Sequence, residues 1–368
     1  MSNFSCFDGA KILITGHTGF KGSWLSLWLT KLGAQVYGVS QDIPTTPSLF
    51  TSIELDKKLK DYRFDICEKD LLNNLIGEIK PNFIFHLAAQ SLVRPSYKDP
   101  LNTLKTNALG TAKVLESLRL LDIPIVAVMI TSDKVYDNVE WPWGYREIDR
   151  IGGKDPYSAS KGMAELVIRT YNESFFKNQN SQVKIGIARA GNVIGGGDWA
   201  EDRIVPDCVR AWSKGKIVSI RNPKSTRPWQ HVLEPLSGYL TLAAYLNKNP
   251  KKNCEAYNFG PLVHQTFSVE KLIDEMSKLW GDQLRWENFS TFGLGIHEAG
   301  LLKLNCDKAL QDLNWIPTLD FEETIRMTAK WYKTFYNDIS SSMSEFTLNQ
   351  ISEYTELAYS RTKLVKNE

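Results

Sequence analysis

A tyrosine and a lysine stand four residues apart in Tyr157-Ser158-Ala159-Ser160-Lys161, which would place both side chains on one face of a helix. A phenol with an ordinary pKa of about 10 is a weak base at neutral pH, and a neighbouring cation favours the phenolate. The spacing alone is weak evidence, because Tyr359 and Lys363 repeat it near the C-terminus. The residues that precede the pair in the chain make it a candidate for catalysis.

Four polar residues follow the longest apolar run of the chain. Thr131-Ser132-Asp133-Lys134 comes directly after 125–130, which we predict to be a buried strand. Polar groups at the carboxyl ends of parallel strands face the ligand crevice of an α/β protein. We therefore expect these side chains to lie beside Tyr157. The alternatives are an exposed helix face for the tyrosine and lysine, and a local surface ion pair for the aspartate and its neighbouring lysine.

A glycine-rich segment near the N-terminus has the spacing of a dinucleotide-binding loop. Its glycines lie between a predicted strand over 11–14 and a predicted helix over 22–31. They permit a tight turn, close approach of the backbone to a pyrophosphate, and close helix–strand packing, while the helix N-terminus offers N–H groups to the anion. The alternative is a structural turn without a ligand. The residues that we expect at the cofactor are Gly16, His17, Thr18, Gly19, Phe20, Lys21 and Gly22.

Asp42 follows the predicted strand over 35–39, where a carboxylate can reach the ribose of an adenosine. An acid at this place favours NAD over NADP, because a 2′-phosphate would meet a like charge. His17 and Lys21 could face a phosphate and leave NADP open. Asp42 could equally be a turn residue in Asp42-Ile43-Pro44.

Short apolar runs alternate with longer amphipathic stretches over the first two-thirds of the chain. This alternation predicts an α/β fold with a doubly wound parallel sheet of the Rossmann type, covered by helices on both faces. The further strands are predicted over 61–66, 82–87 and 184–188, and the further helices over 70–79, 100–121 and 158–178.

Glycines and prolines divide the chain into shorter pieces after about residue 188. We predict a dinucleotide-binding domain over 1–187, with returning segments near 228–255. A smaller, mixed α/β substrate domain is predicted over 188–337, and a polar tail over 338–368 that could dock one helix. The tryptophans of the second domain are expected mainly in its core, since aromatic side chains dominate protein cores.

Composition excludes several classes of protein. The chain has 368 residues and a net charge of +2, with no basic stripe that would indicate a nucleic-acid partner. Its five cysteines are scattered and its five histidines lack metal-ligand spacing, so we expect neither a disulfide framework nor a metal site. We find no signal peptide and no apolar run long enough to cross a bilayer. These features predict a cytoplasmic protein without a membrane partner.

The combined motifs resemble those of the extended short-chain dehydrogenases/reductases. The resemblance covers about residues 8 to 335 and rests on the glycine loop, His86-Leu87-Ala88-Ala89, Asn107, Thr131–Tyr136 and Tyr157–Lys161. Within that family the chain is most similar to the nucleotide-sugar 4,6-dehydratases, and among them to the members that act on CDP-glucose. That closer similarity lies in three stretches, namely Thr15–Trp24, Thr131–Tyr136 and Ala188–Trp199.

The resemblance implies a role for each residue near the catalytic pair. Tyr157 would take the proton of the sugar 4-hydroxyl as the C4 hydride leaves, Ser132 would hydrogen-bond that hydroxyl, and Lys161 would hold the nicotinamide ribose. Asp133 would protonate the departing 6-hydroxyl. Lys134 stands where many sister dehydratases have a glutamate, so it would be the base at C5, and its pKa would have to fall for that role.

The family pattern also implies the binding residues. Arg227 and Asn192 match positions that contact the substrate diphosphate, an anion that suits the arginine fork, and Arg203 is a further cation. Each of these could also be an ordinary surface residue. Gln90 is expected on the substrate side. The remaining cofactor residues are expected to be Asp65, Ile66, Leu87, Ala88, Ala89 and Asn107.

Two other functions stay open. The chain could act on GDP-mannose or dTDP-glucose, or be a 4-epimerase, although epimerases usually carry small or apolar residues in place of Asp133-Lys134. It could also be a non-catalytic dinucleotide-binding regulator, although such proteins usually lose the tyrosine or the lysine. The helices over 100–121 and 158–178 resemble those that pair across a two-fold axis in the family, so we expect a homodimer or a homotetramer.

Overall fold

The computed structural model describes residues 2–177, 181–220, 222–249, 252–262, 265–281, 286–288, 301–338 and 340–366. Its centre is a seven-stranded sheet in the order β11-β6-β5-β4-β1-β2-β3, and every neighbouring pair in it is parallel. The predicted doubly wound sheet is therefore confirmed. Its strands are β1 (Lys11–Thr15), β2 (Gln35–Ser40), β3 (Lys60–Arg63), β4 (Phe83–His86), β5 (Ile125–Ile130), β6 (Val183–Ala190) and β11 (Glu255–Phe259).

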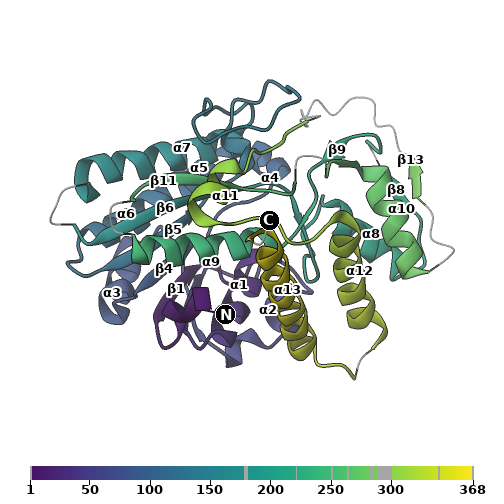
Figure 1. Ribbon diagram of the computed structural model, residues 1–368, viewed down its shortest axis with the longest axis horizontal. Coiled ribbons are helices and arrows are strands. Elements are labelled where there is room, and N and C mark those ends of the chain that lie inside the picture. The colour runs from purple at the N-terminus through teal and green to yellow at the C-terminus, as the bar shows by residue number, and fades with distance from the viewer. Residues whose placement is uncertain are drawn as a thin grey trace.

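Helices cover both faces of the sheet, as its continuously apolar central strands require. All six residues of β5 are buried. One face packs on α1 (Phe20–Lys31) and α9 (Leu233–Lys248). The other face packs on α3 (Lys69–Ile79), α6 (Gly110–Arg119) and α7 (Pro156–Tyr171). The sheet and these helices fill one half of the molecule in Figure 1.

The two long predicted helices are both interrupted by π-helical turns. The first consists of α5 (Pro100–Leu104), the π turn η3 (Lys105–Leu109) and α6. The second, α7, continues into the π turn η5 (Asn172–Phe176), and its predicted end at residue 178 lies outside the described residues. Such turns arise from local packing, so the periodicity of the sequence does not reveal them.

A second group of small elements lies beside the carboxyl ends of the strands and fills the other half of Figure 1. Partway through this group the chain returns to the sheet through α9 and β11, and it then re-enters the group. The exact limits of the two domains stay a prediction. The elements of this group are β7 (Val193–Ile194), α8 (Ile204–Trp212), β8 (Val218–Ile220), β9 (Thr226–Arg227), β10 (Gln230–His231), β12 (Phe267–Ser268), α10 (Val269–Trp280) and β13 (Trp286–Asn288).

The C-terminal region docks on the body through a long helix. After α11 (Asp307–Leu313) and α12 (Phe321–Asn337), the chain forms α13 (Met343–Lys366). The hydroxyl of Tyr354 in α13 donates to a carboxylate oxygen of the buried Glu234 in α9, 2.9 Å away. The shorter elements are η1 (Ser2–Phe7), α2 (Leu49–Ser52), η2 (Leu55–Lys57), α4 (Val93–Lys98) and η4 (Asp133–Val135).

Candidate active site

The glycine-rich turn leads from β1 into the N-terminus of α1, and its shape depends on missing side chains. Gly16 has a φ of +81°, and a Cβ there would lie 2.6 Å from the backbone nitrogen of Ala88. A Cβ at Gly22 would overlap the carbonyl oxygen of Gly16. Gly19 is the N-cap of α1, so the first N–H groups of the helix are available to an anion. The turn fits the pyrophosphate of a dinucleotide.

Replacing Gly22 with alanine is expected to weaken NAD binding by about tenfold to a hundredfold. The added methyl group forces the turn open, and overpacking of this kind costs about 1–3 kcal/mol. Titration of NAD with calorimetric detection measures the change. The control is Gly77→Ala in α3, where a Cβ would meet nothing within 4 Å. Equal NAD affinity in the two variants would contradict the assignment of the turn.

The side chains of the turn point in different directions. His17 is fully buried, and its ring nitrogens lie 2.9 Å from Ser40 Oγ and 2.9 Å from Asp61 Oδ1. Burial lowers the pKa of His17, although Asp61 opposes this shift. The imidazole therefore faces the protein interior, and a phosphate could meet only the backbone of this residue. Thr18 Oγ1 donates to the carbonyl oxygen of Asp42 (2.6 Å), which fixes the exposed segment after β2 beside the turn.

The segment after β4 runs alongside the turn. The Thr15 hydroxyl accepts a hydrogen bond from the backbone nitrogen of Ala88 (3.3 Å), which holds Leu87 and Ala89 next to Gly16. Asn107 lies in η3 and donates to Ser160 Oγ (2.8 Å) in α7.

Asn107 also accepts a hydrogen bond from the Gln90 backbone nitrogen at 2.8 Å. The amide of Gln90 in turn bonds the backbone of Leu92 through both its nitrogen and its oxygen. Both side chains therefore fix the loop after β4 to its surroundings.

The two residues expected beside the adenine lie after β3. Asp65 Oδ1 accepts a hydrogen bond from the backbone nitrogen of Cys67 at 2.9 Å. Ile66 is buried against Gly110 of α6, where a Cβ would lie 2.8 Å from Ile66 Cδ1. The first contact is that of a turn, and the second is ordinary packing, so an adenine contact by either residue stays a prediction.

The catalytic candidates meet where β5 ends and α7 begins. Ser132 caps the short turn η4 by accepting a hydrogen bond from the backbone nitrogen of Lys134 (3.2 Å), and its hydroxyl donates to Asp133 Oδ1 (3.0 Å). Tyr157 and Lys161 reach the same place from the first turns of α7, whose N-cap is Asp155. Tyr157, Ser132, Asp133 and Lys161 are all buried. The structure thus brings together the two segments that the sequence singled out.

Burial controls the protonation of this cluster. It raises the pKa of Tyr157 to about 12, a shift opposed by a hydrogen bond with Ser132 and by the charge of Arg203. It lowers the pKa of Lys161 to about 8, opposed by Glu165. It also raises the pKa of Asp133, opposed by Lys134, the hydrogen bond with Ser132, and Lys21. Burial thus favours neutral forms, and nearby cations and hydrogen bonds determine how much phenolate forms.

Lys21 and Tyr239 are two further groups at this cluster. The ammonium of Lys21 donates to the hydroxyl of Tyr239 at 3.4 Å. Burial, together with the charges of Arg203 and Lys161, lowers the pKa of Lys21 to about 8, and Asp133 opposes this shift. Lys21 therefore extends from the glycine turn toward the catalytic residues. No local sequence pattern indicates Tyr239, because α9 is brought to the site only by the fold.

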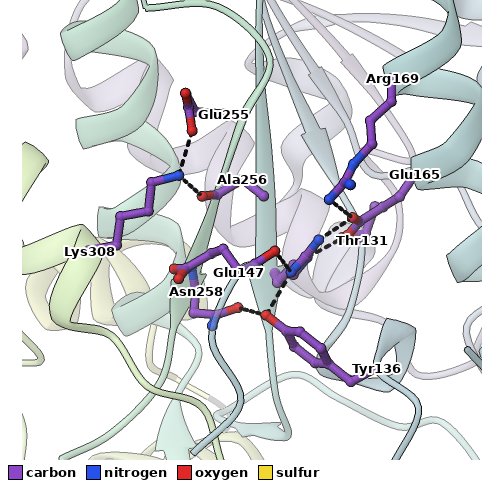
Figure 2. A network of polar contacts seen from close by, with 10 residues as sticks. Thr131, Tyr136, Glu147, Glu165, Arg169, Glu255, Ala256, Asn258 and Lys308 are labelled. Carbon is purple, nitrogen blue, oxygen red and sulfur yellow. Dashed lines mark hydrogen bonds and ion pairs between the residues drawn. The ribbon is translucent and has the colours of Figure 1, made fainter. Parts of the chain in front are cut away.

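A buried network of polar side chains joins α7 to the ends of neighbouring strands (Figure 2). Arg189 at the end of β6 donates to Glu165 of α7 from Nε (2.7 Å) and from Nη2 (2.5 Å), and both side chains are fully buried. Thr131 at the end of β5 donates to the same carboxylate (2.7 Å). Tyr136, just after η4, accepts from Arg189 (2.7 Å) and donates to Asn258 of β11 (2.7 Å). The network therefore fixes α7 against three strands.

The expected substrate residues lie on the segments that follow β6. Asn192 is half-buried between β6 and β7, and Arg227 is half-buried in β9, where one guanidinium nitrogen donates to Thr226 O (2.8 Å). Arg203 pairs with Asp198 (2.7 Å), and its charge reaches Tyr157. A pocket lies among these segments, lined by Gly191, Pro228, Gln230, Gly260, Pro261, Leu262, Thr266, Lys303 and Leu304.

This pocket adjoins the catalytic acid candidate. Gly191 lines the pocket, and a Cβ there would lie 3.1 Å from Asp133 Oδ2, so the missing side chain leaves room for the carboxylate beside the pocket wall. Over the described ranges, three or more residues able to bind a metal do not gather in any one place. Over the same ranges, each helix is too short or too polar to cross a membrane.

Comparison with known proteins identifies the family. The family model described as GDP-mannose 4,6 dehydratase matches residues 13–328, which include the glycine turn, the catalytic cluster and Arg227. The chain belongs to this family. The CDP-glucose 4,6-dehydratase of Salmonella typhimurium is 47% identical over 355 residues, which cover 95% of this chain and 97% of the relative. The dTDP-glucose 4,6-dehydratase of Haemophilus influenzae is 25% identical, covering 90% of this chain and 99% of the relative.

Solved structures show the same fold for this member of the GDP-mannose 4,6 dehydratase family. The epimerase Mth375 of Methanothermobacter thermautotrophicus has a TM-score of 0.77 at 23% identity, covering 91% of this chain and 96% of the other. The dTDP-glucose 4,6-dehydratase of Bacillus anthracis, solved in complex with NAD, has a TM-score of 0.73 at 20% identity, covering 88% and 97%.

Proposed function

We propose that this chain is an NAD-dependent enzyme that converts CDP-glucose to CDP-4-dehydro-6-deoxy-D-glucose with loss of water. The observation that carries the proposal is the buried cluster of Tyr157, Ser132 and Asp133 beside a glycine turn that fits a dinucleotide. The 47% identity with a CDP-glucose 4,6-dehydratase over almost the whole chain supports the choice of substrate. The alternatives are a sister dehydratase acting on GDP-mannose or dTDP-glucose, and a 4-epimerase.

Tyr157 begins the reaction as the base for the sugar 4-hydroxyl. Its phenolate, favoured by Arg203 and by the Ser132 hydroxyl, takes the hydroxyl proton as C4 becomes a ketone. When bound, the nicotinamide supplies reversible hydride transfer, from C4 and later to C6. Lys161 lies one helical turn after Tyr157, where it can hold the ribose of the cofactor.

Asp133 and Lys134 then complete the loss of water. The new 4-ketone acidifies the hydrogen on C5, so a base there and an acid at O6 suffice for elimination. Burial raises the pKa of Asp133, which favours the protonated form that a proton donor needs. Lys134 starts from the same short turn, η4, and is the candidate base.

The substrate diphosphate would bind the arginines that follow β6. Arg227 and Arg203 supply guanidinium groups, and Asn192 supplies an amide from the segment between β6 and β7. The pocket lined by Gln230 and Lys303 also includes Gly191, the neighbour of Asp133, and offers one cation and one amide to the sugar nucleotide.

The function is tested by incubating the enzyme with NAD and CDP-glucose. The expected result is a 4-keto-6-deoxy sugar nucleotide, identified by mass spectrometry and NMR, without accumulated NADH. GDP-mannose and dTDP-glucose serve as competing substrates. A 4-epimer, or faster turnover of either competitor, would overturn the proposal.

The role of Lys134 is tested by hydrogen exchange at C5. Lys134→Ala is expected to slow exchange of the C5 hydrogen with deuterated solvent by about a hundredfold, as is typical for loss of a general base. The measurement follows deuterium incorporation into the product by NMR. Exchange at the normal rate would show that another group is the base. Lys177→Ala is the control, because this lysine is 66% exposed and lies outside the proposed site.

We also propose that the protein forms a dimer through α5, η3 and α7. Large apolar side chains are exposed on these helices, among them Leu101 (77%), Leu109 (59%), Leu166 (56%) and Met163 (43%). The two helical segments pack against each other, so these side chains lie on neighbouring surfaces. Exposed apolar residues gathered in one region indicate a protein interface.

The variant Leu109→Glu with Leu166→Glu is expected to be a monomer in analytical ultracentrifugation, because a dimer would bury the new charges. Ile148→Glu is the control, since Ile148 is 85% exposed on a loop elsewhere. A wild-type monomer would refute the dimer, and a wild-type tetramer that the double variant reduces to dimers would place this surface in one of two interfaces.

A further inference from the structure

In the proposed reaction, Tyr157 gains one proton and Asp133 loses one proton in each turnover, and both must return to their starting states. Water leaves as the 6-hydroxyl plus one proton, and the 4-hydroxyl loses one proton when C4 becomes a ketone. Tyr157 holds the proton that was released, whereas Asp133 must supply the proton that is used. Within one turnover, a proton must therefore travel from the phenol to the carboxylate or enter from solvent.

Bulk solvent has little access to these groups. The exposed fractions of Tyr157, Ser132 and Asp133 are 7%, 6% and 5%. A substrate and a dinucleotide lying on the cluster would cover it further. The proton is therefore more readily supplied from within the site than from water outside it.

The Ser132 hydroxyl lies between the two groups. It donates to Asp133 Oδ1 at 3.0 Å, and it lies close enough to the phenol of Tyr157 to hold down the pKa of that phenol. The backbone nitrogen of Lys134 donates to the same oxygen at 3.2 Å, as the cap of η4. These contacts hold the hydroxyl in place while its proton is exchanged, which is what a proton relay requires.

We propose that Ser132 passes the substrate's own 4-hydroxyl proton from Tyr157 to Asp133. The phenol O–H breaks as a new O–H forms on Ser132, and the original Ser132 O–H breaks as one forms on Asp133. Asp133 then protonates O6, the C5–H electron pair forms the C5–C6 double bond, and the C6–O6 bond breaks. Tyr157 and Asp133 end the cycle ionised, as they began it, and the base delivers to C5 a proton that can have exchanged with solvent.

The surroundings of Asp133 suit a carboxylate that gains and loses a proton within each cycle. Burial favours its neutral form, while the cations Lys134 and Lys21 favour its ionised form. The opposing influences bring the two forms closer in free energy. The relay rests on the proposed dehydration and gives Ser132 a task beyond its hydrogen bond to the sugar.

The first test compares three variants in a single turnover with NAD and CDP-glucose. Ser132→Ala is expected to oxidise C4 and then stall, so that NADH absorbance and the 4-keto-glucose nucleotide accumulate about tenfold or more above wild type. Asp133→Asn should show the same accumulation. Ser132→Thr keeps a hydroxyl and should show none. A slow Ser132→Ala variant that never accumulates NADH would overturn the relay, because Ser132 would then assist only C4 oxidation.

The second test uses the wild-type protein and a CDP-6-deoxyglucose substrate, which has no 6-hydroxyl to expel. Oxidation at C4 should leave the proton on Asp133, so a protonated carboxyl band should appear in the infrared difference spectrum as NADH forms. Asp133→Asn should lack that band. Formation of NADH without the band would refute the relay. Absence of any dehydration product from CDP-glucose would instead refute the proposed function, so the two failures are distinguishable.

Discussion

Replacing Tyr157 with phenylalanine is expected to slow C4 oxidation by about a thousandfold, within the range typical for loss of a positioned base. The substitution removes one buried oxygen and keeps the ring, so the packing of α7 against β5 should persist. The affinity for the sugar nucleotide should change little, because the diphosphate contacts lie on other segments. Stopped-flow detection of NADH in a single turnover, together with a substrate titration, separates the two effects.

The chain contains its own control for this substitution. Tyr359 and Lys363 have the same spacing in α13. However, Tyr359 is 56% exposed, and α13 lies far along the chain from the strands of the sheet. Tyr359→Phe should leave oxidation at the wild-type rate. A Tyr157→Phe enzyme that keeps more than about a tenth of wild-type activity would show that another group removes the 4-hydroxyl proton.

Replacing Arg189 with methionine is expected to lower the free energy of unfolding by about 3–5 kcal/mol, the usual cost of leaving a buried charge without its partner. Glu165 would keep only the hydrogen bond from Thr131 and the distant Arg169, 3.9 Å away. Equilibrium unfolding in urea gives the change. The carboxylate would be left buried without its cation or water, so α7 should shift relative to β5 to expose it, and turnover should fall as well.

The partner substitution separates charge from packing. In the double variant Arg189→Met with Glu165→Leu, neither charge is buried, so much of the lost stability should return. Turnover should stay low, because Thr131 now loses its bond to Glu165 and Tyr136 loses its bond from Arg189. Lys177→Met, which removes an ion pair whose side chains are 66% and 61% exposed, should leave stability unchanged. Equal stability of the Arg189 variant and wild type would show that the network is dispensable.

Short sequence patterns were sufficient to predict many of the strands and helices of the sheet. The continuous apolar run in β5 and the glycine spacing before α1 each identify their element from a few adjacent residues. The predicted strand over 61–66 was less accurate, because β3 is an edge strand that ends at Arg63 and shows little hydrophobic pattern. The second half was harder to predict, since its strands of two or three residues form only through pairing with distant segments.

The candidate reactive groups could be identified from the amino-acid sequence. The glycine turn, the Tyr157–Lys161 pair and the acid after β5 are each formed by neighbouring residues, whose spacing depends only on helix and strand geometry. The protonation and orientation of those groups depend on the folded chain. Folding buried His17 behind the turn, directed Lys21 to Tyr239, and placed Arg189 against Glu165. The reason is physical: burial and pairing depend on which distant segments meet, and these set protonation and position.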